Sequence, residues 1–424
     1  MLSFLLKNTA YGFLVLAGVI AVVFFLFNLA PGDPVRNLVG ENASEDVVKA
    51  MRRKLDMDLP VGQRFVLYLN DLSPLSINNP TNEESRIYFD EKKYSGVQLI
   101  KFTDNKALVL KAPYLKRSFL SDKSVSSILA EVLPGTFVLA VVSIVLAMIL
   151  GLLMGIVAAL NKDSFYDRLM LFISAIGMAG PSFFVAIIVA WIGAIIWREE
   201  IKLPLFLVVF SLLFLIIKPF IKKQLKDVRN KRIFNYSLIG VLVVWLIPVC
   251  AGAQVPFITS TVTLPGTGLN MTGSLYSVDV WKGEYLDLRN MILPVVTLMI
   301  RPLSVIVQLT RSSLLDVMQQ DYIRTARAKG LSETKVVFKH ALRNALNPVI
   351  TAVSGWFASL LAGAIFVEFV FGWKGLGQQM FTAIENRDLP VVMGGVIVIA
   401  FFFVLINILV DIVYGWIDPR VRIG

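Results

Sequence analysis

The chain has 424 residues, of which 56% are hydrophobic and only 17% are charged, and its formal net charge is +11. A soluble globular protein carries about 25% charged residues, so this chain is too apolar to bury its surface in a water-soluble core, and lipid must cover it. With one cysteine and one histidine, an intrachain disulfide, a thiol metal cluster and a histidine-rich metal site are not expected, and we expect no cofactor.

A membrane-spanning helix needs about 20 mainly apolar residues, and eight segments of the sequence meet this requirement. The segment 10–29 is longer than the apolar part of a typical signal peptide and lacks a small-x-small cleavage site, so we interpret it as a retained span. An odd number of spans, with the weakest segment re-entrant, stays open as an alternative. The expected spans are 10–29, 128–159, 169–197, 203–220 (the weakest), 233–252, 291–311, 345–369 and 391–416.

Lys and Arg are concentrated in two of the short segments between spans. Residues 218–232 contain seven basic residues and one acid, and residues 311–343 contain seven basic residues and three acids. The loops 198–202 and 371–390 carry equal numbers of both signs. Because basic loops stay in the cytoplasm, we expect both termini to be cytoplasmic and residues 30–127 to lie outside. The same distribution accounts for the net charge without a nucleic-acid partner.

The stretch 30–127 is the one region large enough for a folded part outside the membrane. Ser44 can cap a helix that places Val48 and Met51 on one face, together with Val47 and Leu55. Apolar residues alternate in 97–101 and 108–110 on either side of 103–106, which is typical of a β-hairpin. We therefore expect a small α+β extracytoplasmic lobe.

The segment 321–348 has the pattern of two short helices joined at a glycine. Asp321 can cap the first helix, and Gly330 can end it in the left-handed conformation that favours glycine. Ser332 can cap the second helix, with Glu333 in its first turn, where the helix dipole favours an acid. The pattern predicts a compact elbow between two spans.

The first helix of this elbow combines small and basic residues. Small side chains let a partner protein approach the backbone closely, and arginines can hold that partner by charge-assisted hydrogen bonds. A basic elbow that lies on anionic lipid headgroups fits the spacing equally well. The small residues are Thr325, Ala326 and Ala328, and the basic ones are Arg324, Arg327 and Lys329.

The run 321–330, followed by Asn344, Asn347 and Pro348, closely resembles the EAA loop of ABC-importer permeases in the dipeptide, oligopeptide and nickel permease family. Further matches follow in the same order along most of the chain, at 31–34, 55–60, 133–136, 368–377, 386–392 and 418–422. The resemblance implies an all-α integral membrane protein with the type I ABC-importer permease fold. It also implies a coupling loop that docks on an ATPase subunit, made of Asp321, Tyr322, Arg324, Thr325, Ala326, Arg327, Ala328, Lys329, Gly330 and Leu331.

The chain departs from the family's usual six spans. It carries an apparent extra hairpin at 198–252, and residues 73–113 have no obvious counterpart in the family. The expected organisation is a first transmembrane helix at 1–29, the lobe at 30–127, transmembrane helices at 128–197, the extra hairpin at 198–252 with its basic cytoplasmic loop, and a permease core at 253–424 that contains the coupling loop 311–343.

The sequence contains no G-x-x-x-x-G-K-[ST] phosphate loop, so the chain is not expected to be an enzyme, and energy must come from separate ATP-binding subunits. The resemblance further implies a second permease, itself or a related chain, an extracytoplasmic substrate-binding protein, and the bacterial inner membrane. Two other classes of protein remain as alternatives. One is a secondary transporter, although the sequence lacks the repeated halves and the several intramembrane acids typical of that class. The other is a membrane-anchored scaffold or enzyme whose working part is the lobe. The cargo is a peptide or a related small solute, and the sequence does not distinguish a dipeptide, an oligopeptide and a nickel chelate.

Two charged residues are candidates for the substrate pathway. Arg301 lies midway along the span 291–311 and precedes Pro302. An intramembrane arginine is costly and usually faces a cavity or an acid. Arg301 therefore either meets a substrate carboxylate, pairs with Glu368 or Asp411, or binds backbone groups freed by Pro302. Glu368, near the end of the span 345–369, is the second pathway candidate.

Overall fold

The computed structural model describes residues 2–29, 34–40, 42–83, 85–90, 94–103, 105–204, 261–279, 281, 283–363 and 365–417. Most of them are helical. Two compact units make up the chain: Met1–Ile187 together with Thr272–Gly424, and Ile188–Met271.

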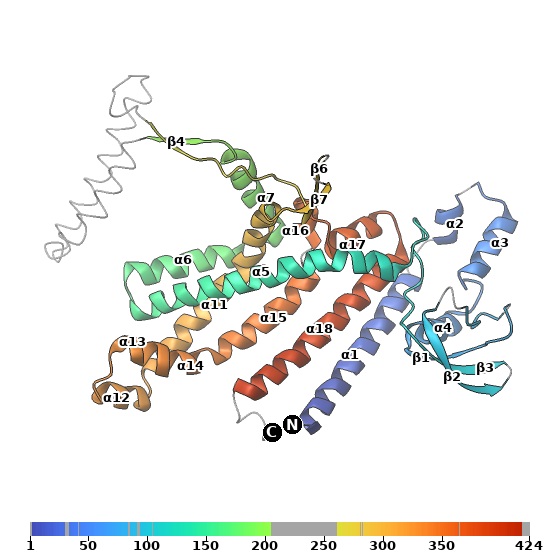
Figure 1. Cartoon of the computed structure of the whole chain (residues 1–424), viewed down its shortest axis with the longest axis horizontal. Helices are drawn as coiled ribbons and strands as arrows, with labels where there is room; N and C mark the ends of the chain where they lie inside the picture. The colour runs from blue at the N-terminus through green and yellow to red at the C-terminus, as the bar shows by residue number, and fades with distance from the viewer. Residues whose placement is uncertain are drawn as a thin grey trace. The chain divides into compact units, whose positions relative to one another are not determined.

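Four helices of the larger unit are long and apolar enough to cross a membrane: α1 (Leu2–Leu29), α5 (Val125–Leu160), α11 (Arg289–Met318) and α18 (Leu389–Ile417), shown in Figure 1. They confirm the predicted spans at 10–29, 128–159, 291–311 and 391–416. Helices α5 and α11 pack closely against each other. At Gly151, for example, a Cβ atom would lie only 2.7 Å from Ile306. Small residues at such a contact allow two backbones to approach.

The third predicted span, 169–197, is not one straight helix. Helix α6 (Phe165–Ala179) ends before Gly180, and helix α7 (Ser182–Ala190) begins after Pro181 and continues as a π-helix over Trp191–Ile196. A residue before proline avoids the helical region, and Gly180 is extended, with ψ 138°. Neither piece alone is long and apolar enough to cross a membrane; only the two together are, as one bent span.

The described residues of the predicted span 345–369 are almost all helical. Helix α15 covers Asn347–Gly363 and helix α16 covers Ile365–Val370. Residue 364 between them lies outside the described residues, so one continuous helix over 345–369 stays a prediction.

In the smaller unit, strands β4 (Ile201–Pro204) and β5 (Thr261–Leu264) pair antiparallel, with Ile201 opposite Leu264. The Thr267 hydroxyl donates to the Gly193 carbonyl at 2.7 Å. Most of the predicted spans 203–220 and 233–252 lies outside the described residues. Residues 203 and 204, at the approximate start of the first of these spans, belong to β4.

The lobe has the α+β composition expected from its sequence. Helices α2 (Pro34–Val39), α3 (Glu45–Lys54) and α4 (Val61–Leu72) precede strands β1 (Leu75–Asn78), β2 (Gly96–Thr103) and β3 (Lys106–Lys111), which form an antiparallel sheet in the order β1-β3-β2. The predicted hairpin is confirmed, with Thr103 opposite Lys106. Ser44 is the N-cap residue of α3, but its side chain makes no capping hydrogen bond.

A buried lysine organises the interior of the lobe. The Lys111 side chain is fully buried, with its Nζ 3.9 Å from Asp71 Oδ1 and 3.9 Å from the centre of the Tyr94 ring. The Tyr94 hydroxyl donates to the same Asp71 oxygen at 2.7 Å. A buried charge requires such partners, so these three side chains join α4, β3 and the segment before β2.

Arg86 attaches the segment between β1 and β2 to the turn after α3. Its Nη1 donates to Asp56 Oδ1 at 2.9 Å and to Asp58 Oδ1 at 3.0 Å. Asp56 has a positive φ of 59°, so the turn holds an aspartate in the left-handed conformation that this short polar residue tolerates. This segment is thus fastened to the helical part of the lobe by charge.

We expect this attachment to weaken in acid. The hydrogen bond from Arg86 lowers the pKa of Asp58 below its usual value. A carboxyl whose pKa is lower in the folded than in the unfolded protein stabilises the fold at a pH above its unfolded-state pKa, near 3.9. This stabilisation is lost as the pH falls through the pKa of the folded state. The protection of residues 55–90 against hydrogen exchange, relative to the intrinsic exchange rate at each pH, should therefore fall below about pH 4, and Arg86→Gln should reduce this dependence. An unchanged pH profile in the variant would contradict the assignment.

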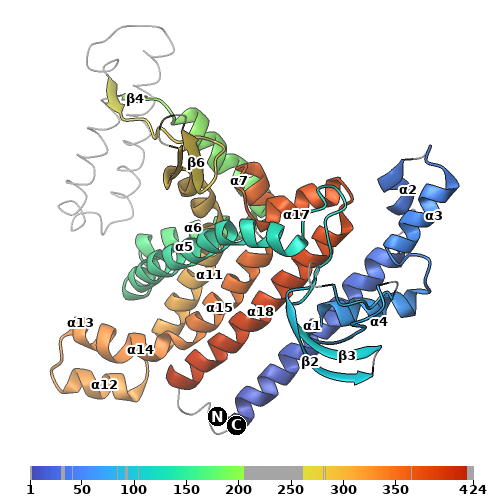
Figure 2. The same cartoon turned by 45° about the vertical axis from the view of Figure 1, so that its right-hand side comes forward.

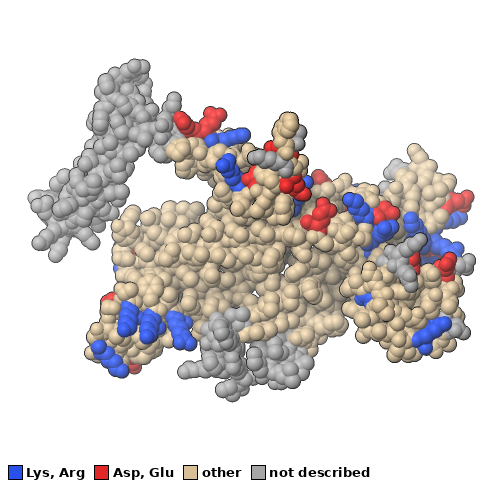
Figure 3. Space-filling model, viewed as in Figure 1, with Lys and Arg blue, Asp and Glu red and all other residues tan. Residues whose placement is uncertain are grey.

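The remaining elements lie at the two ends of the larger unit. The hairpin of β6 (Tyr276–Asp279) and β7 (Gly283–Leu286) and helix α17 (Leu376–Glu385) lie at the end of the helices near the lobe, and α12 (Asp321–Ala328), α13 (Glu333–Lys335) and α14 (Leu342–Ala345) lie at the opposite end (Figures 1 and 2). A π-helix over Val336–Ala341 joins α13 to α14. In Figure 3, Lys and Arg gather over α12–α14, charges of both signs lie over the lobe, and the visible surface of the long helices carries few charges.

Candidate functional site

The elbow, residues 321–345, follows directly from the end of α11. Helix α12 begins at Asp321 with Gln320 as its N-cap, so Asp321 stands in the first turn rather than at the predicted cap. Its carboxylate still favours the positive end of the helix dipole. At the other end Gly330 has a φ of 73°, which confirms the predicted left-handed turn. Ser332 is the N-cap of α13, without a side-chain capping bond.

The inner face of the elbow packs on the ends of two long helices. Ile323 and Val336 are fully buried, and they form one cluster with Ile156 of α5 and Leu314 of α11. Interiors packed this way resist deformation, so a displacement of α12 is passed to the helices that it contacts. The elbow is mechanically part of the helical bundle rather than a free loop.

The outer face of α12 carries the charges and two of the three predicted small residues. Thr325 and Ala328 are exposed, but Ala326 is only 7% exposed and belongs to the buried cluster. The prediction that Ala326 lies on the docking surface is wrong, because it lies three residues from Ile323 on the inward face of the helix. The exposed residues are Asp321, Tyr322, Arg324, Thr325, Arg327, Ala328, Lys329 and Gly330, while Leu331 is half-buried.

Two contacts hold the helices of the elbow together across the glycine turn. Arg327 donates from Nε and Nη2 to the two carboxylate oxygens of Glu333, at 2.8 and 3.2 Å. The Asn344 amide donates to the Tyr322 hydroxyl at 2.7 Å, which joins α14 to α12. Both pairs are exposed, so each adds little to stability. They join the helices of the elbow. The other two cations of this surface are Arg324, which pairs with Asp321 of its own helix at 3.5 Å, and Lys329, the C-cap of α12.

A further ion pair fastens the helix that leads into the elbow. Arg311 of α11 donates from Nη2 to Asp167 Oδ2 of α6 at 2.7 Å, and the Asp167 side chain is almost fully buried. A two-point arginine–carboxylate contact sets orientation as well as distance. Sequence reasoning missed this pair, because 144 residues separate its members and no spacing pattern relates them.

Arg301 is exposed on α11, and its guanidinium carbon lies 5.8 Å from the centre of the Trp356 ring on α15. In the part of the chain that the structure describes, no ion pair joins Arg301 to Glu368. The predicted pairing of these two residues is therefore wrong, and the Asp411 side chain lies outside the described residues. An aromatic face attracts a cation but leaves its hydrogen-bond donors available.

Glu368 is fully buried and binds the start of α17. Its Oε2 accepts from the backbone N–H groups of Gly377 and Gln378 at 2.7 and 3.1 Å, and its Oε1 accepts from the Thr136 hydroxyl at 2.7 Å. The carboxylate of α16 thus caps a neighbouring helix and ties both to α5. A Cβ on Gly375 would lie 2.6 Å from the Thr136 hydroxyl, which explains a glycine at this position.

Comparison of the sequence with known proteins identifies its family and several relatives. Residues 151–423 match the family described as binding-protein-dependent transport system inner membrane component, and residues 1–78 match the N-terminal part of such membrane components. A dipeptide transport system permease of Alkalihalophilus pseudofirmus is 29% identical over all of both chains. A di/tripeptide transport system permease of Pseudomonas aeruginosa is 30% identical over 100% of this chain and 99% of its own. A dipeptide transport system permease of Escherichia coli is 28% identical over 100% and 99%.

Proposed function

This chain belongs to the family of inner membrane components of binding-protein-dependent transport systems and is a permease subunit of an ABC importer, and we propose that its elbow receives the mechanical work of a separate ATPase subunit. Closure of the ATPase displaces α12. The displacement passes to α5 and α11, and the pathway between the permeases changes from outward-open to inward-open.

One observation carries this proposal: α12 is buried on one face and basic on the other. Ile323 and Ala326 fix it to the ends of α5 and α11, while Arg324 and Lys329 point outward. A helix that only rested on lipid headgroups would not need a rigid connection to two spans. A helix that transmits force needs both the connection and an exposed face that a partner can hold.

The assembly that we propose has two permeases, two ATP-binding subunits and an extracytoplasmic substrate-binding protein. The elbow and both termini face the cytoplasm of a bacterial inner membrane, and the lobe at 30–127 lies outside. The basic side chains of the elbow support this orientation (Figure 3).

We assign peptides as the cargo, since relatives along the full length are named for dipeptide and di/tripeptide transport. Arg301 is then a contact for the peptide carboxylate. An exposed arginine within a span must face a water-filled cavity or a partner rather than lipid. Glu368 has no exposed surface, so its part in the pathway is to position α17 and not to touch cargo.

Co-purification tests the proposed function. The detergent-solubilised chain, expressed with its neighbouring ATPase genes, should retain an ATP-hydrolysing subunit. A double substitution of the outward cations, Arg324→Glu with Lys329→Glu, should release that subunit without changing the amount of permease in the membrane. The matched control is Lys106→Glu, an exposed lysine of the lobe. Retention of the ATPase by the double variant would refute the proposed docking site.

For Arg301 we expect a loss that depends on the cargo's carboxylate. A charge-assisted hydrogen bond is worth about 1.5–3 kcal/mol, so Arg301→Gln should raise the KM for a dipeptide by about 10-fold or more. A C-terminally amidated dipeptide should show a much smaller difference between the variant and the parent. Uptake by membrane vesicles measures both, and Arg301→Lys should retain part of the affinity.

The amidated peptide also distinguishes a pathway residue from a packing residue. If Arg301 only packs on Trp356, its replacement changes the uptake of both peptides equally. Such a result, or unchanged uptake of the free dipeptide, would remove Arg301 from the pathway.

A further inference from the structure

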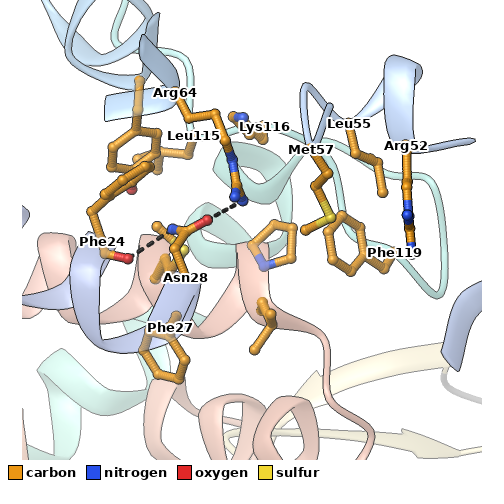
Figure 4. A pocket seen from close by; sticks show the side chains of 14 residues that line it. Phe24, Phe27, Asn28, Arg52, Leu55, Met57, Arg64, Leu115, Lys116 and Phe119 are labelled. Carbon is orange, nitrogen blue, oxygen red and sulfur yellow. Dashed lines mark hydrogen bonds between the residues drawn. The ribbon is translucent and has the colours of Figure 1, made fainter. Parts of the chain in front are cut away.

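A cavity of about 410 Å³ lies where the lobe meets the helical bundle (Figure 4). Its walls come from four places: the end of α1, the region of α3 and α4, the segment 115–119, and the start of α18. The volume is within the range of small-molecule sites, roughly 300–1,000 Å³. It is separate from the elbow, which lies at the other end of α11 and α18, and the proposed transport mechanism does not use it.

The cavity is lined by both apolar and basic side chains. Phe24, Phe27 and Phe119 give it aromatic walls, and Arg64 and Lys116 are among its three basic residues, the third being Arg52. None of the fourteen described residues that line it is acidic. An excess of cations beside aromatic surface fits a ligand with a negative head and a hydrocarbon body.

Two acids beside the cavity take part in bonds of its walls. Asp388, which precedes the lining residue Leu389, accepts from the Ser118 hydroxyl at 2.5 Å and from the Phe119 N–H at 3.0 Å. Asp56 accepts from Arg86 at 2.9 Å. The bonds of Asp388 hold the segment 115–119 against the start of α18.

Arg64 is held in the wall of the cavity by a hydrogen bond. Its guanidinium donates to the side-chain oxygen of Asn28, whose amide in turn donates to the Phe24 carbonyl at 2.7 Å (Figure 4). Partial burial lowers the pKa of Arg64, which remains far above neutral. A partly desolvated cation bonded to a neutral amide gains more from an anion than a fully hydrated one does.

The position of the cavity defines where its ligand comes from. The apolar stretch of α1 ends at Asn28, and that of α18 begins at Leu389. Both residues line the cavity. It is therefore level with the ends of two spans, where phospholipid headgroups meet the acyl chains.

We propose that this cavity binds the phosphate headgroup of an anionic phospholipid from the leaflet beside the lobe, with the glycerol and upper acyl chain against the aromatic wall. The bound lipid fastens the lobe to α1 and α18. Recognition depends on the charge excess and the aromatic wall together, so a headgroup of no net charge, and inorganic phosphate without a chain, bind poorly.

Native mass spectrometry of the detergent-purified full chain tests the proposal. Phosphatidylglycerol should bind at least about 10-fold more tightly than phosphatidylcholine, and an excess of inorganic phosphate should not displace it. The double variant Arg64→Gln with Lys116→Gln should lose about 10-fold or more in affinity for phosphatidylglycerol. Lys106→Gln, which removes an exposed cation of the same lobe outside the cavity, should bind as the parent does.

A second measurement keeps the proposal open to refutation if the double variant does not fold. Phosphatidylglycerol with a photoreactive group beside its headgroup should label the unaltered protein within residues 115–119 or 389–393. Labelling only elsewhere, equal binding of phosphatidylcholine, or displacement by inorganic phosphate would each overturn the assignment.

Discussion

Replacing Ala328 with tryptophan is expected to reduce transport about 10-fold or more while leaving the permease in the membrane. Ala328 is exposed at the last position of α12, next to the outward cations. Tryptophan there costs the isolated helix less than about 1 kcal/mol, because no neighbouring side chain has to move. It does obstruct a partner that must approach the backbone closely, and such overpacking costs a docked interface about 1–3 kcal/mol.

The measurement is peptide uptake by vesicles, together with ATP hydrolysis by the assembled transporter. Ala328→Ser is the matched control, since it keeps a small side chain and should transport as the parent does. Uptake at the parent's rate in the tryptophan variant would mean that nothing docks at this face of α12. Loss of protein from the membrane in both variants would indicate a folding role instead.

Replacing Glu368 with alanine is expected to cost about 3–5 kcal/mol of stability. Its carboxylate accepts from two backbone N–H groups at the start of α17 and from the Thr136 hydroxyl, and all of these groups are in a buried region. Removing the acceptor leaves three donors unsatisfied, and each such group costs about 1–3 kcal/mol. The chain's thermal unfolding midpoint in detergent should fall by several degrees.

Two controls separate this effect from a general change of charge. Glu368→Gln keeps the shape and one acceptor oxygen, so its loss should be smaller than that of Glu368→Ala. Glu385→Ala removes an exposed acid at the end of α17 and should leave the unfolding midpoint unchanged. An alanine variant as stable as the parent would show that the buried carboxylate is not the cap of α17.

Length and apolarity were sufficient to predict four spans, because a bilayer demands both from any helix that crosses it. They did not predict the break at Gly180 and Pro181. Proline alone is an ambiguous signal in a membrane protein: α11 continues through Pro294 and Pro302, and α5 continues through Pro134. What differs at 180–181 is the preceding glycine, which readily takes the extended conformation.

The elbow was predicted from capping residues and a glycine, since those signals are local. The direction in which its residues point was not predicted. Ala326 is small in sequence like Ala328, yet only the position of Ile323 and the ends of α5 and α11 make it inward-facing. A helical-face count that used Ile323 as the buried reference would have found this.

Contacts between distant residues were out of reach of the sequence. Arg311 with Asp167, and Lys111 with Asp71 and Tyr94, depend on how helices and strands come together in space. Glu368 was noticed as part of a motif, but its role as a cap for α17 follows only from the fold. Motifs indicate which residues matter more readily than they indicate what those residues touch.

The most direct test of the coupling role is the accessibility of α12 to a membrane-impermeant maleimide. A cysteine at Ala328, in a chain whose own Cys250 is replaced by serine, should react only after the cells are permeabilised, and the assembled ATPase should protect it. Labelling in intact cells would place the elbow on the outer surface and contradict the account.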